Sequence, residues 1–207
     1  MKIVCLSDTH QHGRDLKVPD GDVLVHCGDL TYGGSMREVE YELDWLHGLP
    51  HKHKIFIAGN HDFYFESSDH TVLKQYPELT YLQDSGVEIN GVKFWGSPWT
   101  TEFMNWAFQL KTPYHAREHW ARIPNDLDIL ITHGPPHGIG DTVPSGEMVG
   151  DGPMFAAILQ VKPKHHLCGH IHGGYGERFF NGIHFVNCAV NNERYMIANP
   201  PVVFECS

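Results

Sequence analysis

Basic residues are scarce in this 207-residue chain. It has 15 lysines and arginines against 25 aspartates and glutamates, which gives a formal net charge of -10. Non-specific binding to duplex nucleic acid or to an anionic membrane surface requires the opposite balance, because the protein must neutralise phosphate charges. The sequence therefore predicts neither a duplex nucleic acid nor a membrane as a partner. It leaves the oligomeric state open.

Cysteine pairs and long apolar runs are also missing. The five cysteines are odd in number, none forms a C-x-x-C pair, and four lie in apolar, strand-like runs. This pattern indicates buried free thiols in a reducing compartment. No apolar run is long enough to span a membrane, and the first six residues leave no room for a signal peptide. We therefore expect a cytoplasmic protein.

Short apolar runs and helical patterns alternate along the chain, without internal repeats or low-complexity segments. Capping signals predict helices after Ser35 (with Glu38 three residues later), after Thr112-Pro113 and after Gly152-Pro153. Runs rich in Ile, Val, Leu and Phe predict eight strands: 2–7, 22–27, 54–58, 92–96, 128–132, 165–168, 183–186 and 202–205. This alternation predicts one α/β domain over residues 1–207, with a loop over 138–152.

Five polar clusters each follow directly after one of these strand-like runs. They are Asp8-Thr9-His10, Gly28-Asp29, Gly59-Asn60-His61-Asp62, Thr132-His133 and Gly169-His170-Ile171-His172. A carboxylate, an amide or an imidazole at the end of a buried strand is unfavourable unless something pairs it, and a cation pairs several at once. Strand ends in an open α/β sheet converge on one crevice. Seven such groups therefore predict two cations.

The donor atoms narrow the choice of metal. Three residues offer oxygen and four offer imidazole nitrogen: Asp8, Asp29, Asn60, His10, His133, His170 and His172. This mixed set suits manganese, iron, zinc, cobalt or nickel better than calcium. Asp29 stands alone after its strand, so we expect its carboxylate to bridge the two ions.

In this order, the five clusters resemble the pattern of the calcineurin-like metallophosphoesterase superfamily, which reads D-x-H, G-D, G-N-H-D/E, a lone H and G-H-x-H. The resemblance implies that Asp8, His10 and His172 bind one transition-metal ion. It implies that Asn60, His133 and His170 bind the other, with Asp29 between them, and that His61 is catalytic. One slight departure is the aspartate, rather than the commoner glutamate, after His61.

Four further segments are similar to the brain-type subgroup of metallophosphoesterase-domain-containing proteins, a subgroup similar to class III cyclic nucleotide phosphodiesterases. They are Thr132-His133-Gly134-Pro135-Pro136, Gly96-Ser97-Pro98-Trp99, Gly173-Gly174-Tyr175-Gly176 and Asn199-Pro200-Pro201. The resemblance covers nearly the whole chain. It implies the metallophosphoesterase fold, a four-layer α/β/β/α sandwich of two mixed sheets. The strand pattern by itself leaves a single sheet equally open.

The expected chemistry is hydrolysis of a small phosphoester. Two ions roughly 3.5–4 Å apart can hold a water between them and lower its pKa, so that hydroxide becomes the nucleophile. We expect His61 to protonate the leaving alkoxide and Asp62 to hold its imidazole in one tautomer and raise its pKa. Manganese is the first choice of metal, in a divalent or trivalent state.

The substrate is less constrained by the sequence. A compact chain without long insertions favours an open site for a phosphodiester, and the subgroup resemblance points to 2',3'- or 3',5'-cyclic nucleotides. Arg14, His137 and Tyr175 lie shortly after ligand clusters and are candidate substrate-binding residues. The aromatic residues Trp95, Trp99, Phe103, Trp106 and Phe108 are expected to pack in the core or a lid, although stacking on a flat leaving group is the alternative.

Three other interpretations stay open. A phosphomonoesterase acting on nucleotides or phosphoproteins is less favoured, because basic side chains that grip a dianion are sparse near the clusters. A catalytically silent metal-binding scaffold on this fold would generally lack a ligand or the catalytic histidine. A structural zinc site needs only four closed ligands, often cysteines, and leaves too many polar groups unexplained.

Overall fold

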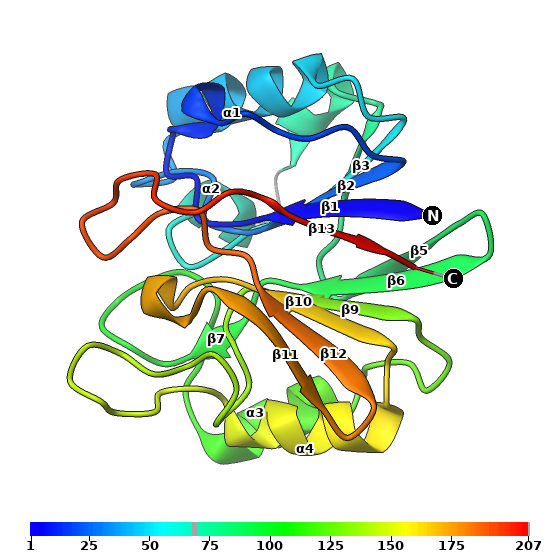
Figure 1. Cartoon of the computed structure of the whole chain (residues 1–207). Helices are drawn as coiled ribbons and strands as arrows, with labels where there is room; N and C mark the ends of the chain where they lie inside the picture. The colour runs from blue at the N-terminus through cyan, green and yellow to red at the C-terminus, as the bar shows by residue number, and fades with distance from the viewer. Residues whose placement is uncertain (68–69, 207) are drawn as a thin grey trace.

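Two mixed β-sheets face each other in the middle of the molecule, and helices cover their outer faces (Figure 1). The computed structural model describes residues 1–67 and 70–206. The first sheet has the strand order β13 (Val202–Glu205), β1 (Lys2–Leu6), β2 (Val23–Cys27), β3 (His53–Ile57) and β4 (Leu79–Tyr81). Of its strands, β13 is antiparallel to its neighbour and the others are parallel.

The second sheet has antiparallel hairpins at both edges. Its order is β11 (Gly176–Phe180), β12 (Ile183–Asn187), β10 (His165–Cys168), β9 (Ile129–Thr132), β6 (Val92–Ser97) and β5 (Ser85–Ile89). The strands β12, β10, β9 and β6 between the hairpins are parallel. Two short strands, β7 (Thr100–Thr101) and β8 (Gln109–Leu110), pair separately.

Helices α1 (Met36–Gly48) and α2 (Phe63–Glu66) lie on the first sheet, and α3 (Pro113–Trp120) and α4 (Gly152–Val161) on the second (Figure 1). Short 3-10 turns span Gly13–Asp15, Thr71–Gln75 and His172–Gly174. The Ser35 hydroxyl accepts a hydrogen bond from the Glu38 N–H, and the Glu38 carboxylate accepts from the Ser35 N–H. All three predicted helices are confirmed.

Three apolar layers hold the sandwich together. Alternate strand residues point to opposite faces, so Ile3 and Cys5 pack between the sheets while Val4 and Leu6 pack towards α1. The inter-sheet layer draws residues from both sheets, and a third layer joins the second sheet to α3 and α4. The four-layer arrangement implied by the resemblance is therefore confirmed, and the single-sheet alternative is wrong.

All eight predicted strands are present, with ends that shift by at most one residue. The sequence did not predict β4, β5, β7, β8, β11 or α2. The strands β5 and β11 are largely exposed edge strands, so they carry no apolar run to detect. All five cysteines are buried and free. Among the described residues, no helix has both the length and the apolar character that a membrane span requires.

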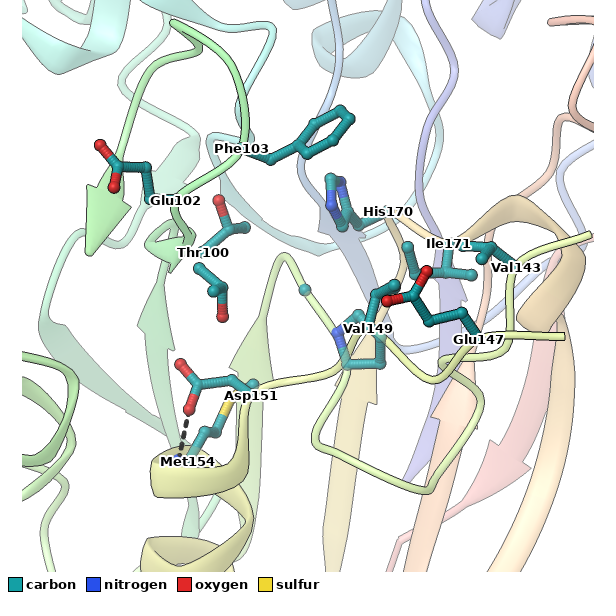
Figure 2. Close-up of a pocket in the computed structure, with 13 residues that line it drawn as sticks. Thr100, Glu102, Phe103, Val143, Glu147, Val149, Asp151, Met154, His170 and Ile171 are labelled. Carbon is teal, nitrogen blue, oxygen red and sulfur yellow. Dashed lines mark hydrogen bonds between the residues drawn. The ribbon is translucent and has the colours of Figure 1, made fainter. Parts of the chain in front are cut away.

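Two cavities adjoin at the end of the sandwich where the central strands finish. The first, of about 410 Å³, is here named the histidine cavity, and its lining includes His10, Asp29, Asn60, His61, His170 and His172. The second, of about 480 Å³, is named the side pocket (Figure 2). It lies between the segment Thr100–Phe103 and the segment 143–154. The two cavities share Phe103, Val143, His170 and Ile171.

Candidate metal centre

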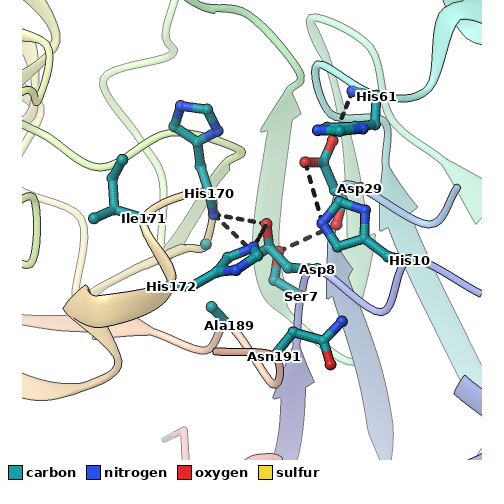
Figure 3. Close-up of polar contacts among 12 residues, drawn as sticks. Ser7, Asp8, His10, Asp29, His61, His170, Ile171, His172, Ala189 and Asn191 are labelled. Carbon is teal, nitrogen blue, oxygen red and sulfur yellow. Dashed lines mark hydrogen bonds and ion pairs between the residues drawn. The ribbon is translucent and has the colours of Figure 1, made fainter. Parts of the chain in front are cut away.

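All seven predicted ligands lie in turns that directly follow a strand. The first sheet supplies Asp8 and His10 after β1, Asp29 after β2 and Asn60 after β3. The second sheet supplies His133 after β9, and His170 and His172 after β10. Figure 3 shows Asp8, His10 and Asp29 facing His170 and His172. The structure thus brings together residues that lie up to 164 positions apart in the chain.

The backbone at these strand ends is unusual. Asp8, His10, Asp29 and His170 have φ angles of 57°, 42°, 56° and 66°, in the left-handed region that residues other than glycine seldom adopt. Such conformations cluster at functional sites, where the surrounding structure maintains them. The glycines of the motifs allow close approach: a Cβ atom on Gly169 would lie 2.1 Å from Asp8 Oδ2.

The predicted ligand atoms form two groups. Those of Asp8, His10 and His172 lie within 4.8 Å of one another, and so do those of Asp29, His133 and His170. A third set, His10, Asp29 and His61, meets the same distance and shares one residue with each group. Asn60 Oδ1 joins the second group, 2.9 Å from His133 Nε2. The resemblance implies that these two groups each bind one metal ion, and that assignment stays a prediction.

Asp29 lies between the two groups. Its Oδ2 atom is 3.2 Å from His133 Nε2 and 3.7 Å from His10 Nε2. Its Oδ1 atom accepts a hydrogen bond of 2.8 Å from the His61 backbone N–H. A carboxylate in this position is placed to bridge two cations.

Four imidazoles are held in one tautomer by backbone carbonyl groups. The Nδ1 atoms of His10, His61, His133 and His172 lie 2.7–3.0 Å from the carbonyl oxygens of Thr31, Tyr32, Cys27 and Asn192 respectively. A carbonyl oxygen only accepts, so each Nδ1 carries the proton and each Nε2 is left for the cavity. Metal-ligating histidines are commonly oriented in this way.

The unpaired acceptors in this cluster fit a bound cation. His10 Nε2 is buried and has no hydrogen-bond partner. His133 Nε2 and Asn60 Oδ1 lie 2.9 Å apart, with the His133 proton on the opposite ring nitrogen, so a proton or a cation must lie between them. Buried lone pairs that converge in this way are costly unless a positive charge compensates them.

The pKa values of the Asp8 and Asp29 carboxylates also indicate a site for a cation. Burial by itself would raise the pKa of Asp29, but the positive charge and hydrogen bond of His133 outweigh it and hold that pKa well below its ordinary value. For Asp8 burial is opposed in the same way by His172, and the pKa also falls. Burial is likewise outweighed at His133, where Asp29 raises the pKa to about 9. Both carboxylates are therefore anionic, and the cluster already requires a positive charge.

Asp62 does not hold the His61 imidazole, contrary to the sequence-based prediction. Its carboxylate accepts hydrogen bonds from the backbone N–H groups of Leu30, Thr31 and Gly59, and from the Thr31 hydroxyl. The partner of His61 Nδ1 is the Tyr32 carbonyl oxygen, 2.7 Å away. Asp62 is fully buried and joins the loop after β2 to the loop after β3, so it positions these loops.

The three predicted substrate-binding residues lie outside the lining of the histidine cavity. Arg14 donates a hydrogen bond to the Tyr41 carbonyl oxygen, and its guanidinium lies over the Tyr41 ring. His137 lies 3.6 Å from Asp141, and the Tyr175 hydroxyl donates to the Pro200 carbonyl oxygen. Each of these side chains faces a structural partner.

Aromatic side chains surround the predicted ligands, and the sequence did not predict this position for most of them. The Trp106 ring lies 4.1 Å from the His61 ring, centroid to centroid, and the Tyr195 ring lies 4.8 Å from that of His10. The aromatic residues between positions 95 and 108 have two different locations. Trp95 and Phe108 are buried in the core, whereas Phe103 and Trp106 line the histidine cavity. Nothing in the sequence around Tyr195 marks it.

Two buried histidines behind the ligands were also missed. The His26 ring accepts a hydrogen bond from the Gly28 N–H and lies 3.0 Å from the Thr9 hydroxyl, which donates to Glu42. On the other sheet, His166 Nε2 lies 2.8 Å from the Thr132 hydroxyl. Burial lowers the pKa of both histidines to about 3, so they stay neutral. Both threonines are direct neighbours of predicted ligands in the chain.

Comparison with known proteins agrees with this geometry. The chain matches the model of the calcineurin-like phosphoesterases over residues 1–174. It is 39% identical to human metallophosphoesterase domain-containing protein 1, over 99% of this chain and 70% of that protein. A UPF0046 protein of Caenorhabditis elegans is 34% identical over 99% of this chain and 74% of its own length.

Among solved structures, the protein TT1561 of Thermus thermophilus has a similar fold. Its TM-score is 0.62 at 14% identity, and the match covers 90% of this chain and 88% of that one. The ligand clusters, the two facing sheets and the sequence matches all agree. The chain belongs to the calcineurin-like phosphoesterase family.

Proposed function

We propose that this protein is a dinuclear metal-dependent phosphodiesterase. The observation that carries the proposal is the pair of ligand groups joined by Asp29, with the His61 ring beside them. In the proposed assignment Asp8, His10 and His172 hold one ion and Asn60, His133 and His170 hold the other. Bound transition-metal ions, manganese by preference, would activate a water and neutralise charge on the phosphoryl oxygens.

His61 is assigned the proton transfer. Its Nδ1–H is committed to the Tyr32 carbonyl oxygen, so Nε2 is the atom free to act in the cavity. In the reaction, the oxygen of water joins phosphorus and the P–O bond to the leaving alcohol breaks. One proton of the water reaches the departing oxygen through His61 Nε2, which ends with the proton count it began with, and the other proton leaves to solvent. The Trp106 ring against His61 restricts how that imidazole turns.

A phosphodiester suits the cavity better than a phosphomonoester. Among the described residues, no lysine or arginine lines the histidine cavity, whereas Glu193 does. A dianionic monoester would bring one more negative charge without a basic side chain to meet it. A monoanionic diester carries less charge to compensate. Cyclic nucleotides of the 2',3' or 3',5' kind remain within this substrate class.

The test compares two chromogenic substrates after reconstitution with manganese. We expect bis(p-nitrophenyl) phosphate to be hydrolysed with a higher kcat/KM than p-nitrophenyl phosphate. A strong preference for the monoester would contradict the diester assignment. Near-stoichiometric bound metal without turnover of either substrate would instead indicate a silent scaffold. Asp29→Asn provides the matched variant, because it keeps the shape of the side chain and removes the charge that joins the two ligand groups.

A further inference from the structure

The side pocket is a second cavity that the assignment of metal ligands leaves unused. It meets the histidine cavity at Phe103, Val143, His170 and Ile171, so a molecule held at the ligand cluster can extend directly into it. Its volume of about 480 Å³ is sufficient for a ring-sized group. Pockets of this kind, with an apolar lining beside convergent polar groups, are typical binding sites for small organic groups.

The lining offers apolar contact rather than polar recognition. Val143, Val149, Met154 and Ile171 present aliphatic or thioether surface, and Phe103 forms part of the wall shared with the histidine cavity (Figure 2). The one buried carboxylate in the lining is already satisfied. Asp151 accepts hydrogen bonds from the Met154 N–H and from the Trp120 indole N–H.

The charge in the side pocket excludes a second anion. Among the described residues, its lining contains no lysine or arginine, and its remaining carboxylates are Glu102 and Glu147, both exposed. An additional phosphate or carboxylate on the ligand would meet these like charges without compensation. The carboxylates therefore disfavour a second anion, and the aliphatic lining favours an uncharged, apolar group.

The position of the side pocket indicates which end of a diester it receives. It is lined by His170 and Ile171 but not by His61, whereas the histidine cavity is lined by all three. In Figure 3, His61 lies beside Asp29, whereas His170 and Ile171 lie together on the left, away from His61. An alcohol that leaves towards His61 thus departs away from the side pocket.

We propose that the side pocket binds the ester group that stays on phosphorus, and that it selects phosphodiesters in which this group is apolar and uncharged. This inference rests on the proposed phosphodiesterase function. It separates the two ester groups of the substrate: the leaving group faces His61, and the retained group lies among Val143, Val149, Met154 and Ile171.

The test uses three diesters with the same p-nitrophenyl leaving group and different retained groups: methyl, phenyl and the anionic 2-carboxyethyl. For the manganese-loaded protein we expect kcat/KM to be about tenfold higher for the phenyl than for the methyl ester, because the ring buries more apolar surface. The carboxyethyl ester should be the poorest. Equal kcat/KM for the phenyl and methyl esters would overturn the proposal.

Substitutions in the lining test whether the preference for the phenyl ester arises in the side pocket. Val149→Glu should bring the ratio of phenyl to methyl kcat/KM towards one, and so should Thr101→Glu on the other segment of the lining. Either variant serves if the other fails to fold. Met148→Glu is the matched control, because Met148 is an exposed neighbour of Val149 that does not line the side pocket. A ratio lost in Met148→Glu to the same extent would contradict the assigned location.

A binding measurement separates failure of this inference from failure of the proposed function. Phenylphosphonate and methylphosphonate are titrated into the manganese-loaded protein by calorimetry, since neither contains an ester bond. If no diester is hydrolysed but phenylphosphonate still binds about tenfold more tightly, the phosphodiesterase assignment is wrong and the side pocket stands. If diesters are hydrolysed and the two phosphonates bind equally, the side pocket assignment is wrong and the function stands.

Discussion

His61 and Asp62 are adjacent in the chain, but their side chains have different surroundings. The His61 imidazole is anchored to the Tyr32 carbonyl oxygen and borders the histidine cavity, whereas the Asp62 carboxylate is buried among backbone N–H groups. At the scale of single residues, two neighbours in the chain thus have side chains with different partners and different roles. The proposed function assigns proton transfer to His61, whereas Asp62 holds together the loops that carry the predicted ligands.

Replacement of His61 should separate catalysis from metal binding. We expect His61→Ala to lower kcat by about 10²- to 10⁴-fold, the usual contribution of a positioned acid or base. Bound metal, measured by elemental analysis, should stay near the wild-type level, because His61 is outside both assigned ligand sets. His115→Ala, on the exposed surface of α3, is the control and should change neither quantity. Equal losses of metal and turnover would show that His61 is structural.

Glu42 should make stability depend on pH. Burial, with a further contribution from Asp62, raises the pKa of Glu42 from 4.5 to about 8, although the Thr9 hydroxyl and Arg14 oppose this. Between these two values the folded protein holds a proton that the unfolded chain has released. Stability therefore falls as pH rises through this window, by about 1.4 kcal/mol per pH unit at most.

The variant Glu42→Gln stays neutral at every pH and removes this loss. We expect its free energy of unfolding, from urea titration, to be close to wild type at pH 5 and to exceed it increasingly towards pH 8. An advantage that is the same at both pH values would show that Glu42 is already charged in the folded protein.

At the scale of secondary structure elements, the same hydrogen bond between a threonine and a histidine occurs on both sheets. A threonine beside a ligand is hydrogen-bonded to a neutral histidine on the adjacent strand: Thr9 to His26 on β2, and Thr132 to His166 on β10. The strand that carries each ligand is thereby coupled to its neighbour in the sheet. Hydrogen bonds behind a metal ligand orient it and contribute to metal affinity.

Loss of one of these links should weaken metal binding. We expect His166→Ala to lower manganese affinity by about tenfold or more, since the turn that carries His133 loses its anchor. His165→Ala is the matched control on the same strand, because His165 contacts His184 and Phe204 instead of Thr132. Both affinities are measured by calorimetry on folded protein. If the two variants lose affinity equally, the effect comes from general destabilisation of β10.

At the scale of the whole molecule, the candidate metal centre joins the two sheets. The His170 backbone N–H donates to the Asp8 carboxylate, and His133 on the second sheet contacts Asp29 on the first. Apolar packing between the sheets continues up to this end of the sandwich. Bound cations would therefore strengthen a connection between halves of the fold, in addition to supporting catalysis.

Removal of metal should lower thermal stability. We expect EDTA treatment to reduce the Tm by several degrees and to increase amide hydrogen exchange in the turn 169–174, because the ligands there lose their common partner. Addition of manganese should restore both quantities. An unchanged Tm, with chelation verified by elemental analysis, would show that the residues of the centre stabilise the fold without metal.

The local features were readable from the sequence. The capping signals at Ser35 and Thr112, and the apolar runs of the central strands, depend on residues a few positions apart, so their meaning is determined by short-range geometry. The family resemblance of the motifs predicted two ligand sets, and the side chains of each set lie close together in the structure. The exposed edge strands β5 and β11 could not be read, because no apolar periodicity marks them.

The surroundings of those ligands depend on tertiary packing. The Tyr32 carbonyl oxygen that anchors His61, the Tyr195 ring beside His10 and the side pocket between residues 100–103 and 143–154 all arise from segments distant in the chain. No local pattern encodes such contacts, since they depend on how two sheets pack and where their loops meet. The sequence specifies which atoms are available for chemistry, and the packing of the sandwich places the groups that surround them.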